Sequence, residues 1–170
     1  HDTVDEMMKW VDHAVSHARS RDASITELEF PYEYRKGQKQ MAACVYKAIE
    51  GERRLFVQAP TGIGKTMAAM FPSVKAFATG LVSKIFYLTA KTIAGTVPDQ
   101  ALTLLRERGV KFSSVMLTAK EKICLNETME CDAEHCPYAK GHFDRVNDAL
   151  FELITQEEKM DREIIRAYAE

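Results

Sequence analysis

A lysine and a threonine follow a glycine-bearing turn near the middle of the chain. Residues 59–66 have the sequence Ala-Pro-Thr-Gly-Ile-Gly-Lys-Thr. The glycines let backbone N–H groups close on phosphate oxygens, the lysine can reach the β- and γ-phosphates, and the threonine hydroxyl can hold Mg²⁺. The pattern therefore predicts a nucleoside triphosphate site in which Lys65 and Thr66 are the catalytic residues. The residues expected to bind the triphosphate are Thr61, Gly62, Ile63, Gly64, Lys65 and Thr66.

The segments on both sides of this turn support the prediction. The usual phosphate-binding pattern begins with a glycine where Ala59 stands here, so the match to the pattern alone is incomplete. The apolar run Leu55–Val57 predicts a buried strand before the turn, and residues 65–79 predict a helix after it. Because a helix N-terminus carries a partial positive charge, this context favours a phosphate site over a turn without a ligand.

Strands and helices are expected to alternate along the next residues. Apolar runs predict further strands over residues 85–88 and 113–117, and a helix over residues 93–108 separates them. This β-α-β-α-β order predicts an α/β fold with a parallel sheet and helices on both faces. The ligands of such sheets lie beyond the carboxyl ends of the strands.

Polar residues follow the strand that is expected at residues 85–88. Thr89, Lys91 and Thr92 would lie on the same edge of the sheet as the phosphate-binding turn. Their hydroxyl and ammonium groups suit a phosphodiester backbone. A polar loop without a ligand is the alternative, and these three residues alone do not exclude it.

An aromatic stretch with an arginine and a glutamine, Phe30–Gln38, precedes a helix that is expected over residues 39–50. A glutamine amide can donate to and accept from an adenine edge, and a guanidinium plane can stack on the base. Arg35 and Gln38 are therefore candidates for holding the base of a nucleotide. The alternative is a loop whose polar residues cap the helix.

Three of the four cysteines lie within thirteen positions of one another: Cys124, Cys131 and Cys136. Thiolates at this spacing can hold zinc or an iron–sulfur cluster. His135 and His142 lie near enough to complete a zinc site, and three unligated thiols are a further alternative; the spacing alone does not choose among them. The fourth cysteine, Cys44, is expected to be a small buried hydrophobe in the helix over residues 39–50.

Length and composition limit the class of protein. With 170 residues, 46% of them hydrophobic, the chain can form the core of about one domain. The formal net charge of −2 gives no general attraction for nucleic acid, so such binding would need a local basic surface. No apolar run reaches the roughly 18 residues of a membrane span, and no signal peptide is recognisable, so a cytoplasmic location is expected. The chain begins without Met and stops inside a helical pattern, so we expect a piece of a larger protein.

Taken together, these motifs resemble the XPD/DinG family of iron–sulfur DNA helicases within helicase superfamily two. Besides the aromatic, arginine and glutamine stretch, the resemblance rests on Ala-Pro-Thr-Gly-Ile-Gly-Lys-Thr, Tyr-Leu-Thr-Ala-Lys-Thr and Thr-Ala-Lys-Glu-Lys-Ile-Cys, and it covers roughly residues 28–170. It implies a P-loop (RecA-like) motor domain that binds ATP and Mg²⁺. In the complete protein it implies ATP hydrolysis that drives movement, 5′ to 3′, along single-stranded or forked DNA.

The resemblance also assigns roles to residues. It implies that Arg35 and Gln38 recognise adenine, and that the phosphate and Mg²⁺ site consists of Gly62, Gly64, Lys65 and Thr66. It implies that single-stranded DNA is contacted by Thr89, Lys91 and Thr92. It implies three of the four ligands of a 4Fe–4S cluster: Cys124, Cys131 and Cys136. The expected domains are a helical lead-in over residues 1–28, the first motor domain over 29–118, and the start of a small, mainly helical cluster-bearing insertion over 119–170, in a monomeric protein.

Two features of this family are missing from the sequence. No fourth cysteine follows Cys136, and no Asp-Glu box for Mg²⁺ occurs, so both are expected beyond Glu170, together with the second motor domain. We therefore expect the 170-residue chain to be inactive as an ATPase by itself. Two other functions stay open: a P-loop kinase or similar transferase, and a non-enzymatic zinc-binding module that has lost nucleotide binding.

Overall fold

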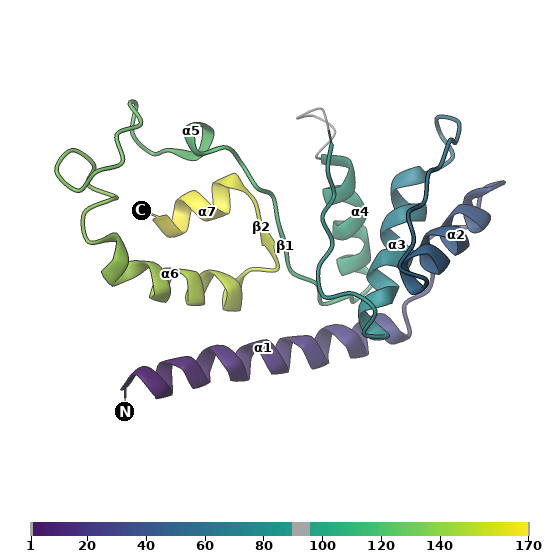
Figure 1. Cartoon of the computed structure of the whole chain (residues 1–170), viewed down its shortest axis with the longest axis horizontal. Coiled ribbons are helices and arrows are strands. Elements are labelled where there is room, and N and C mark those ends of the chain that lie inside the picture. Colours follow the sequence, from purple (N-terminus) through teal and green to yellow (C-terminus); the bar gives the residue numbers. More distant parts are fainter. Residues whose placement is uncertain (1, 90–95, 170) are drawn as a thin grey trace. The chain divides into compact units, whose positions relative to one another are not determined.

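The computed structural model describes residues 2–89 and 96–169, except for the side chains of Asp2 and Thr96. Helices predominate in these residues (Figure 1). The helices are α1 (Asp2–Thr26), α2 (Gln38–Glu50), α3 (Lys65–Ala78), α4 (Thr96–Glu107), α5 (Lys120–Ile123), α6 (His142–Gln156) and α7 (Arg162–Ala169). The strands are β1 (Ser114–Val115) and β2 (Lys159–Met160).

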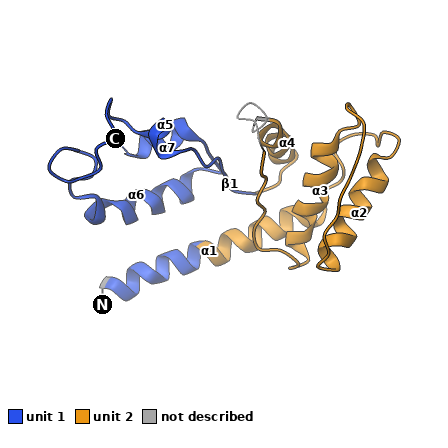
Figure 2. Ribbon diagram, turned by 45° about the horizontal axis from the view of Figure 1, so that its top comes forward, with its two compact units in different colours: residues 1–13, 112–170 blue, residues 14–111 orange. Residues whose placement is uncertain are grey.

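The chain divides into two compact units, shown in orange and blue in Figure 2. Residues 14–111 form one, which contains the predicted phosphate-binding turn and is called the glycine-loop unit here. Residues 1–13 and 112–170 form the other, called the cysteine unit. The domain boundaries expected at residues 28 and 118 stay a prediction; the division into units falls at residues 13 and 111.

The core of the glycine-loop unit lies between α2 and α3, which pack along each other. Helix α3 supplies more buried side chains than any other helix of this unit, among them Met67, Met70, Val74 and Phe77. Its apolar positions recur at helical spacing, so one face of the helix is removed from water. Helix α3 begins at the end of the predicted turn, and Gln38, the first residue of α2, donates to the carbonyl of Gly64, so this packing fixes the position of the end of the turn.

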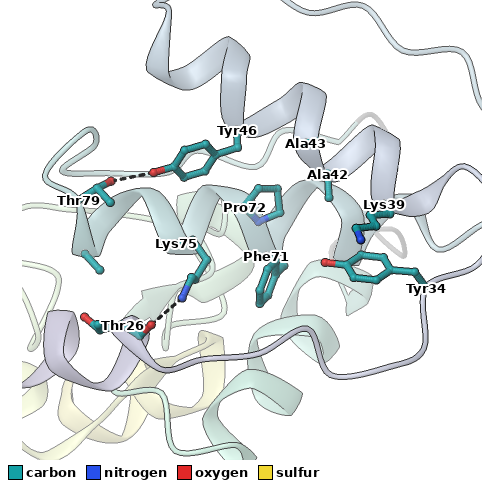
Figure 3. Close-up of a pocket in the computed structure, with 11 residues that line it drawn as sticks. Thr26, Tyr34, Lys39, Ala42, Ala43, Tyr46, Phe71, Pro72, Lys75 and Thr79 are labelled. Atoms are coloured by element: carbon teal, nitrogen blue, oxygen red, sulfur yellow. Dashed lines mark hydrogen bonds between the residues drawn. The ribbon is translucent and has the colours of Figure 1, made fainter.

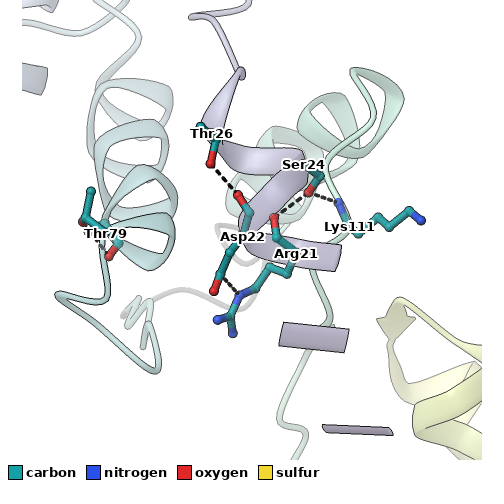
Figure 4. Close-up of polar contacts among 7 residues, drawn as sticks. Arg21, Asp22, Ser24, Thr26, Thr79 and Lys111 are labelled. Atoms are coloured by element: carbon teal, nitrogen blue, oxygen red, sulfur yellow. Dashed lines mark hydrogen bonds and ion pairs between the residues drawn. The ribbon is translucent and has the colours of Figure 1, made fainter. Parts of the chain in front are cut away.

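The C-terminal end of α1 is tied into the same unit by polar contacts (Figure 4). The hydroxyl oxygen of Ser24 accepts a hydrogen bond from the backbone N–H of Lys111 at 3.0 Å. Arg21 pairs with Asp22 at 2.8 Å, and its guanidinium lies 4.6 Å from the centre of the Phe77 ring. These contacts join α1 to α3 and to the segment that follows α4.

Two of the three predicted strands of the motor sheet do not form in the described residues. Residues 55–57 and 85–88 are not strands in the structure, and they are not buried. The side chain of Phe56 is 92% exposed and that of Leu88 is 88% exposed. A strand in a parallel sheet is held by hydrogen bonds to neighbouring strands, and none of the described residues forms a strand beside these segments.

The third predicted strand forms, but with another partner. β1 pairs in parallel with β2, and Ser114 lies opposite Lys159 and Val115 opposite Met160. In place of the three predicted strands, the described residues form a two-stranded sheet, and it lies in the cysteine unit. The sequence assigned only helices to the residues around β2, because this region is charged and poor in strand-forming residues.

Helices α6 and α7 confirm the helical prediction for the C-terminal part of the chain. Within the cysteine unit, the ring of Trp10 lies edge-on to that of Phe151, with 5.1 Å between the ring centres. Cys44 is exposed on α2, so the prediction that it is buried is wrong. The helices of the described parts of the chain include none with both the length and the apolar character of a membrane span.

Candidate nucleotide site and cysteine loop

The predicted phosphate-binding turn ends where α3 begins, at Lys65. Gly62 and Gly64 both adopt the left-handed backbone conformation, with φ of +82° and +81°. Glycine is the residue that adopts this conformation without steric cost, which explains its presence at both positions. Gly64 is the N-terminal cap of α3 and offers no side-chain cap. The first N–H groups of the helix therefore lack a side-chain partner there, as a phosphate-binding helix end requires.

Arg35 and Gln38 contact the turn through its carbonyl oxygens. The guanidinium of Arg35 donates to the carbonyl of Gly62. The amide nitrogen of Gln38 donates to the carbonyl of Gly64 at 3.3 Å, and its oxygen accepts from the backbone N–H of Arg35 at 3.1 Å. Gln38 is only 3% exposed. The structure thus brings both predicted base-binding residues to the turn, while their contact with a base stays a prediction.

The ammonium group of Lys65 lies against the first part of the turn. It donates to the carbonyl oxygens of Ala59 at 3.1 Å and Pro60 at 2.9 Å. A phosphate carries the negative charge that a neutral carbonyl lacks, so a phosphate is a better partner for this cation. Lys65 and Thr66 are half-buried, whereas Thr61 is exposed.

The residues predicted to touch nucleic acid are only partly described. Thr89 is exposed and follows residues 85–88 directly. Lys91 and Thr92 lie outside the described residues. Their proposed role therefore stays a prediction.

A groove of about 430 Å³ runs along α2 and α3 in the glycine-loop unit (Figure 3). Its walls are mostly apolar and include Tyr34, Phe71 and Pro72, together with two lysines, Lys39 and Lys75. Burial raises the pKa of the Tyr34 phenol. No residue of the predicted phosphate-binding turn lines this groove, so it is separate from the candidate nucleotide site.

The three clustered cysteines all raise the pKa of one lysine in the cysteine unit. The pKa of Lys120 is raised, first by a hydrogen bond to the Cys131 thiol and then by the negative charge that the thiols of Cys131, Cys124 and Cys136 can carry. Cys136 is 7% exposed, and its sulfur accepts a hydrogen bond from the Asn126 amide at 3.2 Å. The sequence predicted the cysteines as a ligand set but missed both of these neighbours.

A second group of possible metal ligands lies in the same loop and was not predicted as a set. One ligand atom each from Glu130, Asp132 and His135 lie within 4.8 Å of one another. The carboxylate of Asp132 pairs with the ring of His135 at 2.8 Å, and hydrogen bonds from His135 lower the pKa of Asp132. His135 was expected as a possible partner of the thiolates in a zinc site; in the structure its ring nitrogen contacts Asp132 instead. The Asp-x-x-His spacing could have indicated this pair. An aspartate side chain commonly accepts hydrogen bonds from the backbone just after it, and such a turn brings the histidine close to the carboxylate.

Comparisons with known proteins support the helicase part of the prediction. Residues 35–158 match the protein family described as DEAD/DEAH box helicase, which is well over half of the chain. A probable ATP-dependent helicase of Methanocaldococcus jannaschii is 43% identical over 47 residues, which are 27% of this chain and 7% of the relative. The matching stretch therefore spans only a small part of that protein. No solved structure gives a significant match.

Proposed function

The chain belongs to the DEAD/DEAH box helicase family, and we propose that it is the ATP-binding part of an ATP-dependent DNA helicase of the XPD/DinG iron–sulfur type. The observation that carries this proposal is the arrangement at the start of α3. There Lys65 donates to two carbonyl oxygens of a turn whose glycines are left-handed and whose helix end has no side-chain cap. We infer that the phosphates of ATP replace these carbonyls as partners of Lys65, and that Thr66 holds Mg²⁺.

Arg35 and Gln38 would then connect the base to the phosphates. Both already bind carbonyl oxygens of the turn, at Gly62 and Gly64. If these side chains also contact adenine, binding of the base would be coupled to the position of the predicted phosphate-binding turn. This supports their assignment to adenine recognition, which the resemblance implies.

The exposed apolar segments support a larger motor domain. The helicase family implies a RecA-like α/β fold, whose sheet is built from parallel strands. Phe56 and Leu88 lie almost fully in water, which is unfavourable for large apolar side chains. We infer that residues 55–57 and 85–88 become strands when paired with strands from the rest of the protein. The Asp-Glu pair for Mg²⁺ and the second motor domain would belong to that part as well.

The nucleic acid would lie at the ends of these strands. Thr89, Lys91 and Thr92 follow residues 85–88 directly, and their hydroxyl and ammonium groups suit phosphates of a single strand. Movement 5′ to 3′ and a preference for single-stranded or forked DNA rest on the resemblance. In this proposal the enzyme acts as a monomer.

The cysteine loop fits a negatively charged, thiolate-bound metal group. Cys124, Cys131 and Cys136 would hold it, and a fourth ligand would come from outside these residues. The fit rests on the Asn126 amide beside the Cys136 sulfur and on Lys120, whose pKa is raised by Cys131 first and also by the charge of Cys124 and Cys136, because donors and cations stabilise thiolates. When bound, a 4Fe–4S cluster would cross-link these thiolates and make the loop rigid. The insertion would then act as a wedge at the point where a duplex separates into single strands.

ATP turnover tests the proposed function. In the full-length protein that carries this chain, single-stranded DNA should stimulate ATP hydrolysis several-fold, and Lys65→Ala should abolish it. The 170-residue chain alone should show no turnover. Hydrolysis that does not respond to DNA would contradict the helicase and favour a kinase-like enzyme.

A further inference from the structure

We propose that Asn126 is a positioning residue of the metal centre, whose side-chain amide donates to the Cys136 sulfur and raises the reduction potential of the bound cluster. This inference rests on the proposed function. It adds a residue that is not a metal ligand and that no motif in the sequence identified.

The contact is specific in its geometry. The amide nitrogen of Asn126 lies 3.2 Å from the Cys136 sulfur, across ten positions of the chain. Asn126 is half-buried, and Cys136 is the most buried of the three clustered cysteines, at 7% exposure. The contact is therefore partly shielded from water, where a hydrogen bond is electrostatically stronger than at the surface.

The backbone around Cys136 is also fixed. Its N–H donates to the carbonyl of Asp132 at 3.0 Å, and its own carbonyl accepts from the N–H groups of Ala139 and Lys140, each at 3.1 Å. These bonds hold the backbone of Cys136, so the direction of its side chain depends on the rotamer and on the contact with Asn126. The amide thus holds the sulfur in one direction without a covalent bond.

The sign of the effect follows from charge. Reduction adds an electron to the cluster and its thiolates, so an N–H donor at a ligand sulfur stabilises the reduced state more than the oxidised one. Removal of the donor should therefore lower the reduction potential. A contact that only stabilises the loop would change the cluster content or the unfolding temperature but would leave the potential of the remaining clusters unchanged.

Two variants and a control test this in the full-length protein, purified without oxygen. Asn126→Leu removes the amide at similar size, and Asn126→Asp keeps the shape while replacing the donor by a negative oxygen. The control is Asn147→Leu, which changes the other asparagine of the chain, exposed on α6. The measurements are iron and zinc content, visible absorption, and a redox titration followed by electron paramagnetic resonance.

Both Asn126 variants should retain iron and titrate at lower potential than the wild type. At the wild-type midpoint, the ratio of reduced to oxidised cluster should fall by roughly three- to tenfold in Asn126→Leu, and at least as far in Asn126→Asp. Asn147→Leu should titrate as the wild type does.

Three results would overturn the inference, and metal analysis separates them. An iron-loaded Asn126→Asp or Asn126→Leu protein with the wild-type potential would contradict it while leaving the proposed cluster intact. Loss of iron from both Asn126 variants, but not from Asn147→Leu, would show that the amide serves only the fold of the loop. A wild-type protein with zinc and no iron would contradict the proposed cluster itself, and the inference with it.

Discussion

The side-chain nitrogen of Gln38 lies 3.3 Å from the carbonyl oxygen of Gly64 and so links the first residue of α2 to the residue before α3. A Cβ atom on residue 64 would lie 2.4 Å from that nitrogen, which is closer than real contacts allow. The predicted phosphate-binding turn is therefore held from the side of α2. Any side chain at position 64 must displace Gln38.

Gly64→Ala should weaken ATP binding by at least about tenfold, or about 1.4 kcal/mol. The added methyl group displaces the Gln38 amide, and alanine is strained at a φ of +81°. Titration calorimetry with ATP and Mg²⁺ measures the effect. The matched control is Gly80→Ala, which has a similar strain at φ +70° but meets nothing within 4 Å of the new atom. Equal affinities in the two variants would show that the Gln38 contact has no role in binding.

Lys75→Met should destabilise the glycine-loop unit by about 1–3 kcal/mol, because three hydrogen bonds to a charged group are lost. The Lys75 ammonium donates to the carbonyls of Ile25 and Thr26, the last residues of α1, at 3.0 and 2.9 Å, and to that of Leu28, just after the helix, at 3.2 Å. Urea unfolding followed by circular dichroism measures the change. Lys39→Met alters an exposed lysine of the same groove and should have little effect; a loss of stability as large as that of Lys75→Met would argue against the helix-end contact.

Asp161→Ala should destabilise the cysteine unit by about 1 kcal/mol at neutral pH, because Asp161 caps α7. Its carboxylate accepts from the N–H groups of Glu163 and Ile164 at 3.0 and 3.1 Å. The hydrogen bond from Ile164 is the main reason why the pKa of Asp161 lies below its ordinary value of 3.8. A carboxyl with a lowered pKa contributes stability above that ordinary value and loses it as the pH falls through the pKa of the folded state.

The difference between wild type and Asp161→Ala should therefore shrink as the pH falls below 3.8. Fluorescence of Trp10, the single tryptophan, follows unfolding of this unit because the ring packs on Phe151. Asp148→Ala, an exposed change within α6, is the control and should show no such pH dependence. A difference that stays constant down to strongly acidic pH would rule out the charged cap.

Local patterns in the sequence predicted the helices well. Helices α2, α3, α6 and α7 lie within a few residues of their expected positions, because a helix forms hydrogen bonds inside its own segment. The strands depend on partners that are far away in the chain. Residues 55–57 and 85–88 have the apolar composition of buried strands but no neighbouring strand among the described residues, and β1 found its partner at β2.

In the candidate site too, local features were predicted from the sequence and long-range contacts were not. The glycines and Lys65 were predicted because the turn needs them at fixed spacing, and the structure has the left-handed glycines at the start of α3. The contact of Gln38 with a carbonyl and that of Asn126 with a sulfur were not predicted, since each joins residues ten or more positions apart. Such contacts follow from tertiary packing, which no local pattern contains.

Calorimetric titration of the 170-residue chain with ATP and Mg²⁺ is the most direct test that residues 59–66 bind the phosphates. The wild type should bind one ATP, adenosine should not compete at equal concentration, and Lys65→Met should weaken binding by at least about tenfold, because a charge-assisted contact is lost. Lys39→Met, which removes an exposed lysine outside the turn, should bind as the wild type does. No saturable binding by the wild type, or equal affinity in Lys65→Met, would contradict the nucleotide site.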